Sequence, residues 1–190
     1  EKAYRDGLDL IPDQPDLYYN LGRALYEQGR WDDAEESFRK TLSLNHAYPL
    51  AHWNLSHVML LNGRFREGWL EYEWRWHCPG FTTQIPKFEQ PRWDGKDISG
   101  KTLLVYAEQG FGDTIQFVRY LPGLSASGCR VIFLCQPELT RLLRDIPGIG
   151  QIVTEWTALP EFDLHTPLMS LPIILGMNEE TEIPSNFPYL

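Results

Sequence analysis

The chain has 190 residues, of which 43% are hydrophobic, and a formal net charge of −9 at pH 7. This length allows one large globular domain or two modest ones, each with a core of its own. The negative charge is spread over both halves of the chain, so neither half offers the basic face that nucleic acids or anionic membranes require. Composition therefore favours a globular protein with no nucleic-acid partner.

The cysteines and the hydropathy pattern indicate where such a protein works. Cys78, Cys129 and Cys135 form no CxxC pair, and an odd number makes a poor disulfide framework, so we expect a reducing, cytoplasmic location. No apolar run approaches the roughly 20 residues that cross a bilayer, and no membrane insertion is expected. Because Glu1 is not a start methionine, we interpret the chain as a piece of a longer protein.

The N-terminal part of the chain repeats itself at an offset of 34 residues. The pairs that recur at this spacing include Pro15 and Pro49, Tyr19 and Trp53, Asn20 and Asn54, Leu21 and Leu55, Gly29 and Gly63, and Phe38 and Tyr72. This pattern resembles the tetratricopeptide repeat, a helix-turn-helix unit. The resemblance implies a helical domain over residues 1–78, with a partial repeat at 1–14 and repeats at 15–48 and 49–77. Since about three units make a stable stack, we expect further repeats before Glu1.

In the first repeat the resemblance implies helices over 17–28 and 31–44, joined at Gly29 and Arg30. In tetratricopeptide proteins the first helices of successive repeats line a concave groove for extended peptides. The resemblance therefore implies a protein or peptide partner. The residues that it places in this peptide-binding groove are Tyr19, Asn20, Arg23, Tyr26, Trp53, Asn54, His57 and Leu61.

The two asparagines of the groove have two interpretations. In repeat proteins that resemble the protein O-glycosyltransferases, asparagines at this position clamp the backbone of the substrate. An amide suits that task because it can donate to a carbonyl and accept from an N–H. Alternatively, Asn20 and Asn54 belong to the common helix pattern of the repeat.

Proline and glycine are frequent between the repeats and the next apolar run, which predicts a linker over residues 79–100. Within it, Trp93 is flanked by Pro91-Arg92 and Asp94-Gly95. We expect Trp93 to anchor the linker by packing against the following domain.

Strand and helix patterns alternate over residues 101–190. Buried strands are predicted at 101–108 and 130–136, and two further strands at 151–155 and 162–166. Helices are predicted from Asp113 onward, at 137–146 and at 168–177 with an interruption at Pro172. Such alternation predicts a parallel sheet with right-handed crossovers, a Rossmann-like domain. The fold class is therefore α + α/β: helical repeats followed by a Rossmann-like parallel-sheet domain.

A tight turn, Gly110-Phe111-Gly112, separates the first of these strands from its helix, and Asp113 stands where an N-cap is expected. The turn is not a dinucleotide fingerprint, because Ile115 occupies the place of the third glycine. Walker, HExxH and GxSxG motifs are absent from the sequence. The histidines and cysteines lack ligand spacing, so no metal is expected.

The segment AEQGFGD, residues 107–113, and the later Pro147-Gly148-Ile149 resemble the N-terminal half of the heptosyltransferase-like, two-domain GT-B glycosyltransferases. Behind tetratricopeptide repeats, this segment is similar to a bacterial group of repeat-containing glycosyltransferases. The resemblance implies an incomplete GT-B fold that supplies the acceptor side. It also implies a nucleotide-sugar donor in the intact parent, bound by a second Rossmann-like half, and no cofactor within this sequence.

By the same resemblance, Asp113 is the catalytic general base that takes the proton of the acceptor hydroxyl. The alternative is that Asp113 only caps its helix. The residues expected around it, in an acceptor-side cleft, are Glu108, Gln109, Gly110, Gly112, Gln116 and His165. We expect His165 at the carboxyl edge of the sheet, where it either binds acceptor or phosphate or serves as a structural imidazole.

These features together predict a fragment of a glycosyltransferase that moves a sugar from a nucleotide donor to a protein docked by the repeats. The fragment alone is expected to be inactive, because the donor-binding half does not follow within this sequence. The alternative is a non-catalytic tetratricopeptide scaffold for protein–protein interaction. A third, weaker interpretation is a nucleotide-binding regulator.

Overall fold

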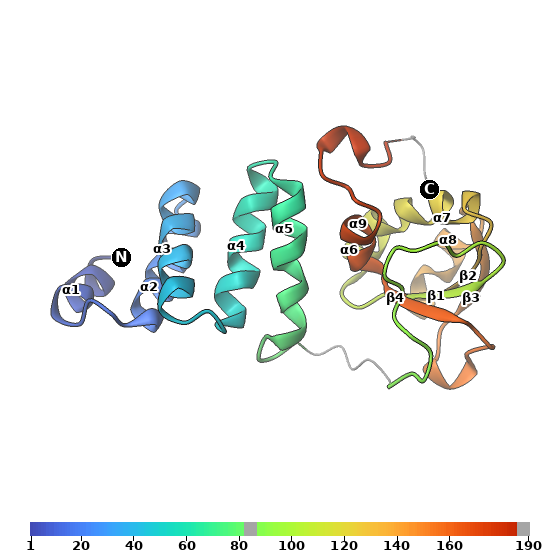
Figure 1. Ribbon diagram of the computed structural model, residues 1–190, viewed down its shortest axis with the longest axis horizontal. Coiled ribbons are helices and arrows are strands. Elements are labelled where there is room, and N and C mark those ends of the chain that lie inside the picture. Colours follow the sequence, from blue (N-terminus) through green and yellow to red (C-terminus); the bar gives the residue numbers. More distant parts are fainter. Residues whose placement is uncertain (82–86, 186–190) are drawn as a thin grey trace. The chain divides into compact units, whose positions relative to one another are not determined.

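The computed structural model describes residues 1–81 and 87–185 (Figure 1). The described residues form two compact units, one of residues 1–81 with 178–180 and the other of residues 87–177 with 181–185. Parts of the predicted linker and of the predicted domain 101–190, namely residues 82–86 and 186–190, lie outside the described residues. The domain boundaries drawn from the sequence stay predictions.

The first unit consists of antiparallel helices in chain order (Figure 1). Its helices are α1 (Lys2–Leu10), α2 (Pro15–Tyr26), α3 (Trp31–Leu44), α4 (Pro49–Leu61) and α5 (Phe65–Tyr72), followed by a 3-10 helix (Glu73–His77). The prediction for α3 is confirmed. Helix α2 begins at Pro15, ahead of the predicted start, because proline lacks an N–H and has a helical φ, which suits a first turn.

The same turn joins the helices of both repeats. Gly29 follows α2 with φ of 74°, and Gly63 follows α4 with φ of 73°. Behind each glycine an arginine amide closes the turn: Arg30 donates to the Leu25 carbonyl at 3.0 Å, and Arg64 to the Met59 carbonyl at 2.9 Å. Only glycine adopts this left-handed backbone at little cost, which explains why glycine recurs with the repeat.

Small residues let the helices of the first unit approach closely. Ala34 on α3 and Ala51 on α4 are fully buried, and Gly22 on α2 lies against the ring of Phe38. The core that they share contains Tyr19, Leu21, Leu25, Ala34, Phe38, Ala51, Leu55, Val58 and Met59. The repeat pattern therefore places small side chains at helix crossings and large ones between them.

The second unit contains one parallel sheet (Figure 1). Its strands are β1 (Thr102–Tyr106), β2 (Arg130–Leu134), β3 (Ile149–Val153) and β4 (Leu164–Pro167), in the order β3-β2-β1-β4. Strands β1 and β2 are buried along almost their whole length, as the apolar runs predict for a sheet covered on both faces. The predicted fold class, helical repeats followed by a Rossmann-like parallel sheet, is confirmed.

The helices of the second unit are shorter than predicted. They are α6 (Phe111–Phe117), α7 (Leu121–Ala126), α8 (Thr140–Leu143) and α9 (Leu171–Ile174), with 3-10 turns at Val118–Tyr120, Pro137–Leu139, Trp156–Ala158, Leu168–Ser170 and Glu180–Glu182. The apolar stripe after Asp113 suggested one continuous helix, but Pro122 has no N–H to donate and its ring would clash with the Val118 carbonyl. No helix in either described range, 1–81 or 87–185, is long and apolar enough to cross a membrane.

Residues 87–100, which the sequence analysis assigned to a linker, pack into the second unit. Arg92 forms a parallel bridge with His165 at the outer edge of β4, and the Trp93 amide donates to the His165 carbonyl at 2.8 Å. The Trp93 side chain is 6% exposed, and its Nε1 donates to the Lys96 carbonyl at 2.8 Å. The prediction that Trp93 anchors this segment is confirmed.

Candidate functional site

The two asparagines of the predicted groove lie on α2 and α4 and form hydrogen bonds with different partners. The Asn20 amide donates to the Asp16 carbonyl at 2.8 Å, whereas the Asn54 amide donates to the Tyr19 hydroxyl at 3.1 Å. A side-chain amide carries two N–H groups and an oxygen, so each asparagine retains polar groups for an extended segment. Both interpretations of these asparagines remain predictions.

The tyrosines of the predicted groove belong to the helical core. Tyr19 is 7% exposed, and its ring centroid lies 5.0 Å from that of Tyr48 and 6.1 Å from that of Phe38. Burial raises the pKa of Tyr19. Tyr26 packs against the same core, and the exposed Arg23 guanidinium lies 5.8 Å from the Tyr19 ring. Of this group, Arg23 is the side chain that solvent reaches most readily.

The remaining groove residues follow one another along α4. The ring of His57 lies 5.6 Å from that of Trp53 and 5.9 Å from that of Tyr72. Burial lowers the pKa of His57, so the neutral imidazole is favoured here. Leu61, at the end of the helix, is 53% exposed. The structure thus brings Tyr19, Arg23 and Asn54 together, and Trp53 with His57.

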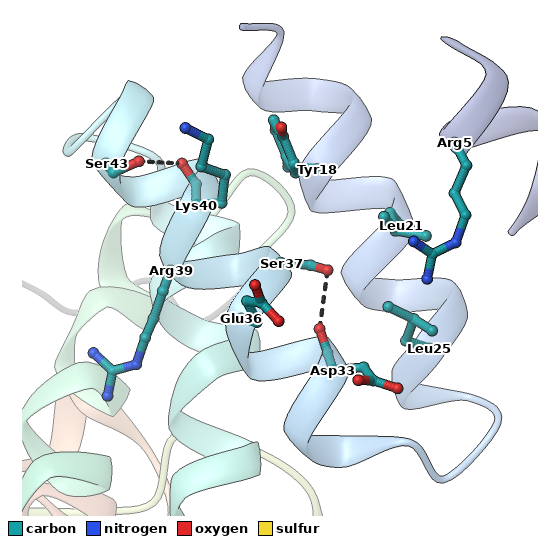
Figure 2. Close-up of a pocket in the computed structure, with 10 residues that line it drawn as sticks. All are labelled: Arg5, Tyr18, Leu21, Leu25, Asp33, Glu36, Ser37, Arg39, Lys40 and Ser43. Carbon is teal, nitrogen blue, oxygen red and sulfur yellow. Dashed lines mark hydrogen bonds between the residues drawn. The ribbon is translucent and has the colours of Figure 1, made fainter. Parts of the chain in front are cut away.

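A second groove, which the sequence did not predict, lies among α1, α2 and α3 (Figure 2). It has a volume of about 620 Å³. Its lining residues are Arg5, Tyr18, Leu21, Leu25, Asp33, Glu36, Ser37, Arg39, Lys40 and Ser43. Leu21 and Leu25 form a floor that is 5% and 1% exposed, and the walls are polar. Because three helices contribute, no single stretch of sequence carries a signal for it.

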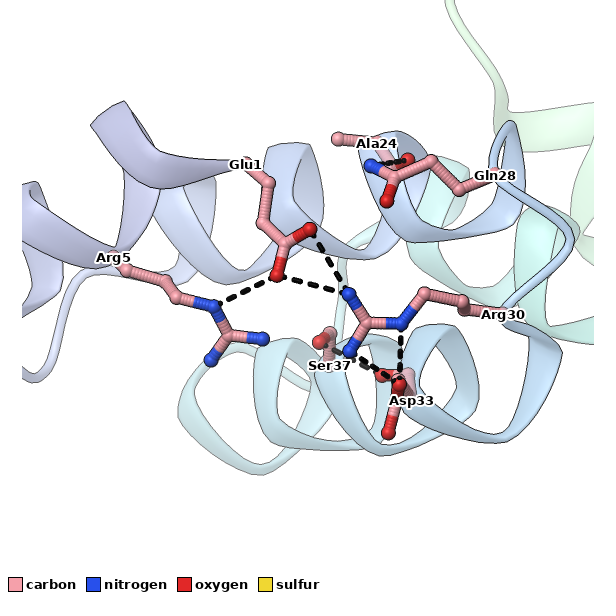
Figure 3. A network of polar contacts seen from close by, with 7 residues as sticks. All are labelled: Glu1, Arg5, Ala24, Gln28, Arg30, Asp33 and Ser37. Carbon is pink, nitrogen blue, oxygen red and sulfur yellow. Dashed lines mark hydrogen bonds and ion pairs between the residues drawn. The ribbon is translucent and has the colours of Figure 1, made fainter.

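Charges at one end of this second groove are joined in a network (Figure 3). The Glu1 carboxylate accepts from Arg5 at 3.0 Å and from Arg30 at 3.0 Å, and Arg30 also pairs with Asp33 at 2.6 Å. Hydrogen bonds from Arg5 and Arg30 lower the pKa of Glu1. These pairs are exposed and contribute little to stability. The groove carries both signs of charge and favours no single ligand class.

In the second unit, the Gly110 turn connects β1 to α6. Helix α6 begins at Phe111 with Gly110 as its N-cap, so Asp113 is the third helical residue. The expectation that Asp113 is the N-cap is wrong, because the helix starts earlier than predicted. The Asp113 Oδ2 instead reaches back and accepts from the Gly110 N–H at 3.1 Å. Gly110 has no side chain to reciprocate, so this is one half of a capping box.

The hydrogen bond from Gly110 uses only one of the acceptor sites of the Asp113 carboxylate. Among the described residues it makes no other hydrogen bond, and its side chain is partly exposed. An ionised carboxylate has about four acceptor sites on its two oxygens. Asp113 therefore has acceptor sites for a substrate group while its orientation is held by the backbone.

Two side chains that the sequence analysis did not select hold this turn against the sheet. Gln136 follows β2 and donates from Nε2 to the Gln109 carbonyl at 2.7 Å. The Thr114 hydroxyl lies 3.0 Å from the Gln136 Oε1 and 3.2 Å from the Gly110 carbonyl. The available signal was position: Gln136 is the polar last residue of the strand predicted at 130–136, next to the strand that leads into the turn.

The other predicted cleft residues lie along the same segment. Glu108 lies two residues after the end of β1 and is 5% exposed. Gln116 is exposed on α6, and beside Gly112 there is open space, with no atom within 4 Å of a built Cβ. Phe111, between the two glycines, is 48% exposed. The segment from Glu108 to Gln116 thus presents polar groups and one aromatic ring at the carboxyl edge of β1.

His165 lies elsewhere than expected. It is the second residue of β4 and pairs with Leu104, so it lies within the sheet rather than at the carboxyl edge of the sheet. Its ring lies 4.7 Å from Phe88, and its Nδ1 lies 3.4 Å from the Tyr106 hydroxyl. Burial, and then the charge of Arg92, lower its pKa. No group of three or more His, Cys, Asp or Glu within the described residues is placed to hold a metal.

Comparison with known proteins identifies the class of the first unit. Residues 15–48 match the family model of the tetratricopeptide repeat. The match covers the whole of the first predicted repeat, α2 and α3 included. The chain therefore contains a tetratricopeptide repeat, a unit that generally binds proteins or peptides.

Two individual proteins are similar to the chain. Protein FlbA of Caulobacter vibrioides is 32% identical over 127 residues, which are 64% of this chain and 21% of FlbA. The chain thus spans about a fifth of the length of this relative. A solved structure of a mutant O-GlcNAc transferase of Thermobaculum terrenum covers 83% of this chain and 38% of its own, with 13% identity and a TM-score of 0.36. That TM-score is too low to establish a common fold.

Proposed function

We propose that this chain is part of a repeat-containing glycosyltransferase. The tetratricopeptide repeats present a protein acceptor, and the second unit forms the acceptor side of a GT-B type transferase whose other half binds the nucleotide sugar. The observation that carries the proposal is the Gly110 turn, which connects the carboxyl end of β1 to α6 and holds the partly exposed Asp113 carboxylate by one backbone hydrogen bond. Ligands of parallel α/β sheets bind at this carboxyl edge.

In this proposal Asp113 is the general base. Its carboxylate takes the proton of the acceptor hydroxyl while the hydroxyl oxygen forms a bond to the anomeric carbon of the sugar. The bond from that carbon to the nucleotide phosphate breaks, and the nucleoside diphosphate leaves. Gly112 and Gln116 contact the acceptor beside Asp113, where the structure has open space and an exposed amide. No metal is assigned a role.

The acceptor is a protein because the repeats supply a place for it to dock. Tetratricopeptide repeats generally bind proteins or peptides, and residues 15–48 are such a repeat. Asn20 and Asn54 on α2 and α4 retain amide groups that can bond a peptide backbone without selecting its side chains. A protein that only recruits partners through this groove is the second candidate function.

Replacement of Asp113 separates the two candidates. In the full-length protein, Asp113→Asn should keep the turn, because an asparagine oxygen can still accept from the Gly110 N–H. It should lower sugar transfer by roughly 10²–10⁴-fold, the usual contribution of a general base. Transfer is measured as nucleoside diphosphate release from a panel of nucleotide sugars together with the mass change of the acceptor.

Asp145→Asn is the matched control, because Asp145 is exposed on the same unit and, within residues 1–81 and 87–185, its carboxylate pairs only with Arg144, at 3.2 Å. It should transfer sugar like the wild type. If Asp113→Asn is equally active, Asp113 is not the base. If the wild type consumes no nucleotide sugar, whereas Asn54→Ala abolishes binding of the acceptor protein, the scaffold function replaces the enzyme.

A further inference from the structure

Gln136 joins both ends of the segment that carries Asp113. Its Nε2 donates to the Gln109 carbonyl at 2.7 Å, and its Oε1 accepts from the Thr114 hydroxyl at 3.0 Å. Gln109 directly precedes residues 110–113, and Thr114 directly follows them. One side-chain amide therefore fixes the entrance and the exit of the turn.

Few side chains can make both bonds. The Gln109 carbonyl needs a donor and the Thr114 hydroxyl needs an acceptor, and a neutral amide offers both at the end of one side chain. A carboxylate would repel the carbonyl, and an apolar side chain would bond neither group. Thr114 is 1% exposed, so its hydroxyl cannot exchange this partner for water.

We propose that Gln136 is a positioning residue that holds the Gly110 turn against the carboxyl end of β2. It thereby sets the direction in which Asp113 meets the acceptor hydroxyl. Thr114 takes part, because its hydroxyl lies between the Gln136 Oε1 and the Gly110 carbonyl, at 3.0 Å and 3.2 Å. The consequence for catalysis rests on the proposed function, whereas the consequence for the turn does not depend on any activity.

The effect on the turn can be measured by hydrogen exchange of the Thr114 amide, which donates to the Gly110 carbonyl at 3.1 Å. Gln136→Met removes both bonds at similar length, and Thr114→Val removes the hydroxyl at similar shape. Each should speed exchange of this amide about tenfold, the effect of losing one shielded hydrogen bond. Thr114→Ser retains the hydroxyl and should exchange like the wild type.

Gln151→Met provides a matched control on the neighbouring strand. It removes one hydrogen bond of a glutamine, from Arg130 to Gln151 at 3.2 Å, without touching the turn. Thr114 exchange should not change in this variant. Gln136→Glu separates the two hydrogen bonds of Gln136, since the carboxylate can still accept from Thr114 but repels the Gln109 carbonyl. The Thr114 amide of this variant should exchange as in Gln136→Met.

In the full-length protein, Gln136→Met and Thr114→Val should each lower kcat about tenfold at unchanged KM for the nucleotide sugar. Thr114→Ser should have the kcat of the wild type. The double variant Gln136→Met with Thr114→Val should have a kcat no lower than that of either single variant, because both substitutions break the same hydrogen-bonded contact between Gln136 and the turn.

Wild-type exchange at Thr114 in Gln136→Met would overturn the positioning role, whatever the enzyme does. Should that variant fail to fold, the difference between Thr114→Val and Thr114→Ser decides in the same way. If the Thr114 amide exchanges faster in Gln136→Met but the full-length wild type transfers no sugar, Gln136 still positions the turn and the proposed function is rejected.

Discussion

At the scale of single residues, Gly22 shows how closely the two helices of a repeat approach. A Cβ at this position would lie 2.7 Å from Cε1 and 2.8 Å from Cδ1 of Phe38, which is itself 0% exposed. Because the Phe38 ring is buried in the core, it can make room for a Cβ only by displacing its neighbours. Gly22→Ala should therefore lower the free energy of unfolding by about 1–3 kcal/mol, measured by urea titration of the helical circular dichroism.

Gly123 on α7 is the control for this substitution. It is exposed, its φ is not left-handed, and a Cβ there would have no heavy atom within 4 Å. Alanine favours the helix by up to about 1 kcal/mol over glycine. Gly123→Ala should thus be neutral or stabilising, and a similar result for Gly22→Ala would disprove the close contact with Phe38.

At the scale of elements, the glycine turns decide where the helices of each repeat end. Gly29 and Gly63 have φ of 74° and 73°, and no atom lies within 4 Å of a Cβ built on either. Replacement by alanine should therefore cost only the backbone strain, about 1 kcal/mol. Asparagine tolerates this conformation better, so Gly29→Asn should lose less stability than Gly29→Ala in the same urea titration. Equal losses would exclude backbone strain as the cause.

The elements of the repeat were predicted better than those of the sheet unit. Helix α3 matches its predicted range, because the repeat supplies start and stop signals within a few residues. The helix expected after Asp113 breaks into α6 and α7, because the ring of Pro122 would clash with the Val118 carbonyl in a continuous helix. The apolar periodicity of the segment contains no information about this clash. Strand β3 begins at Ile149, two residues before its predicted start, since Ile149 pairs with Val131 of β2 and the strand continues through Gly150.

At the scale of the whole molecule, each unit contains a histidine that is harder to protonate when folded. Burial lowers the pKa of His57 in the first unit, and burial with the charge of Arg92 lowers that of His165 in the second. The unfolded chain, with histidine pKa values near 6.5, therefore binds more protons in mild acid. The contribution of these two histidines to the free energy of unfolding is therefore fully present above about pH 6.5 and is lost as the pH falls below it.

The free energy of unfolding should thus decrease between about pH 7.5 and about pH 5.5, a window above the ordinary titration of carboxyl groups. His57→Gln and His165→Gln should each reduce this decrease. Urea titrations of the wild type and the two variants at both pH values measure the effect, and a larger decrease in either variant would contradict the sign.

Part of the candidate site could be predicted because its residues are neighbours in the chain. The segment from Glu108 to Gln116 follows a buried strand, and parallel strands point their carboxyl ends to one edge. Gln136 follows β2 and His165 lies on β4, and their positions depend on the register of these strands. Register pairs His165 with Leu104 and brings Gln136 to the turn, and the second groove likewise needs three helices packed together.

By itself, the sequence determined the helical repeat, the parallel sheet, and a glycine turn with an aspartate behind the first strand. Those features depend on spacing and on backbone preferences that act over a few residues. Only the tertiary structure decided that Asp113 bonds Gly110 as the third residue of α6, and that Gln136 and Thr114 hold the turn. Hydrogen bonds between distant segments depend on packing to within a fraction of an ångström, and hydrophobic periodicity does not specify positions that closely.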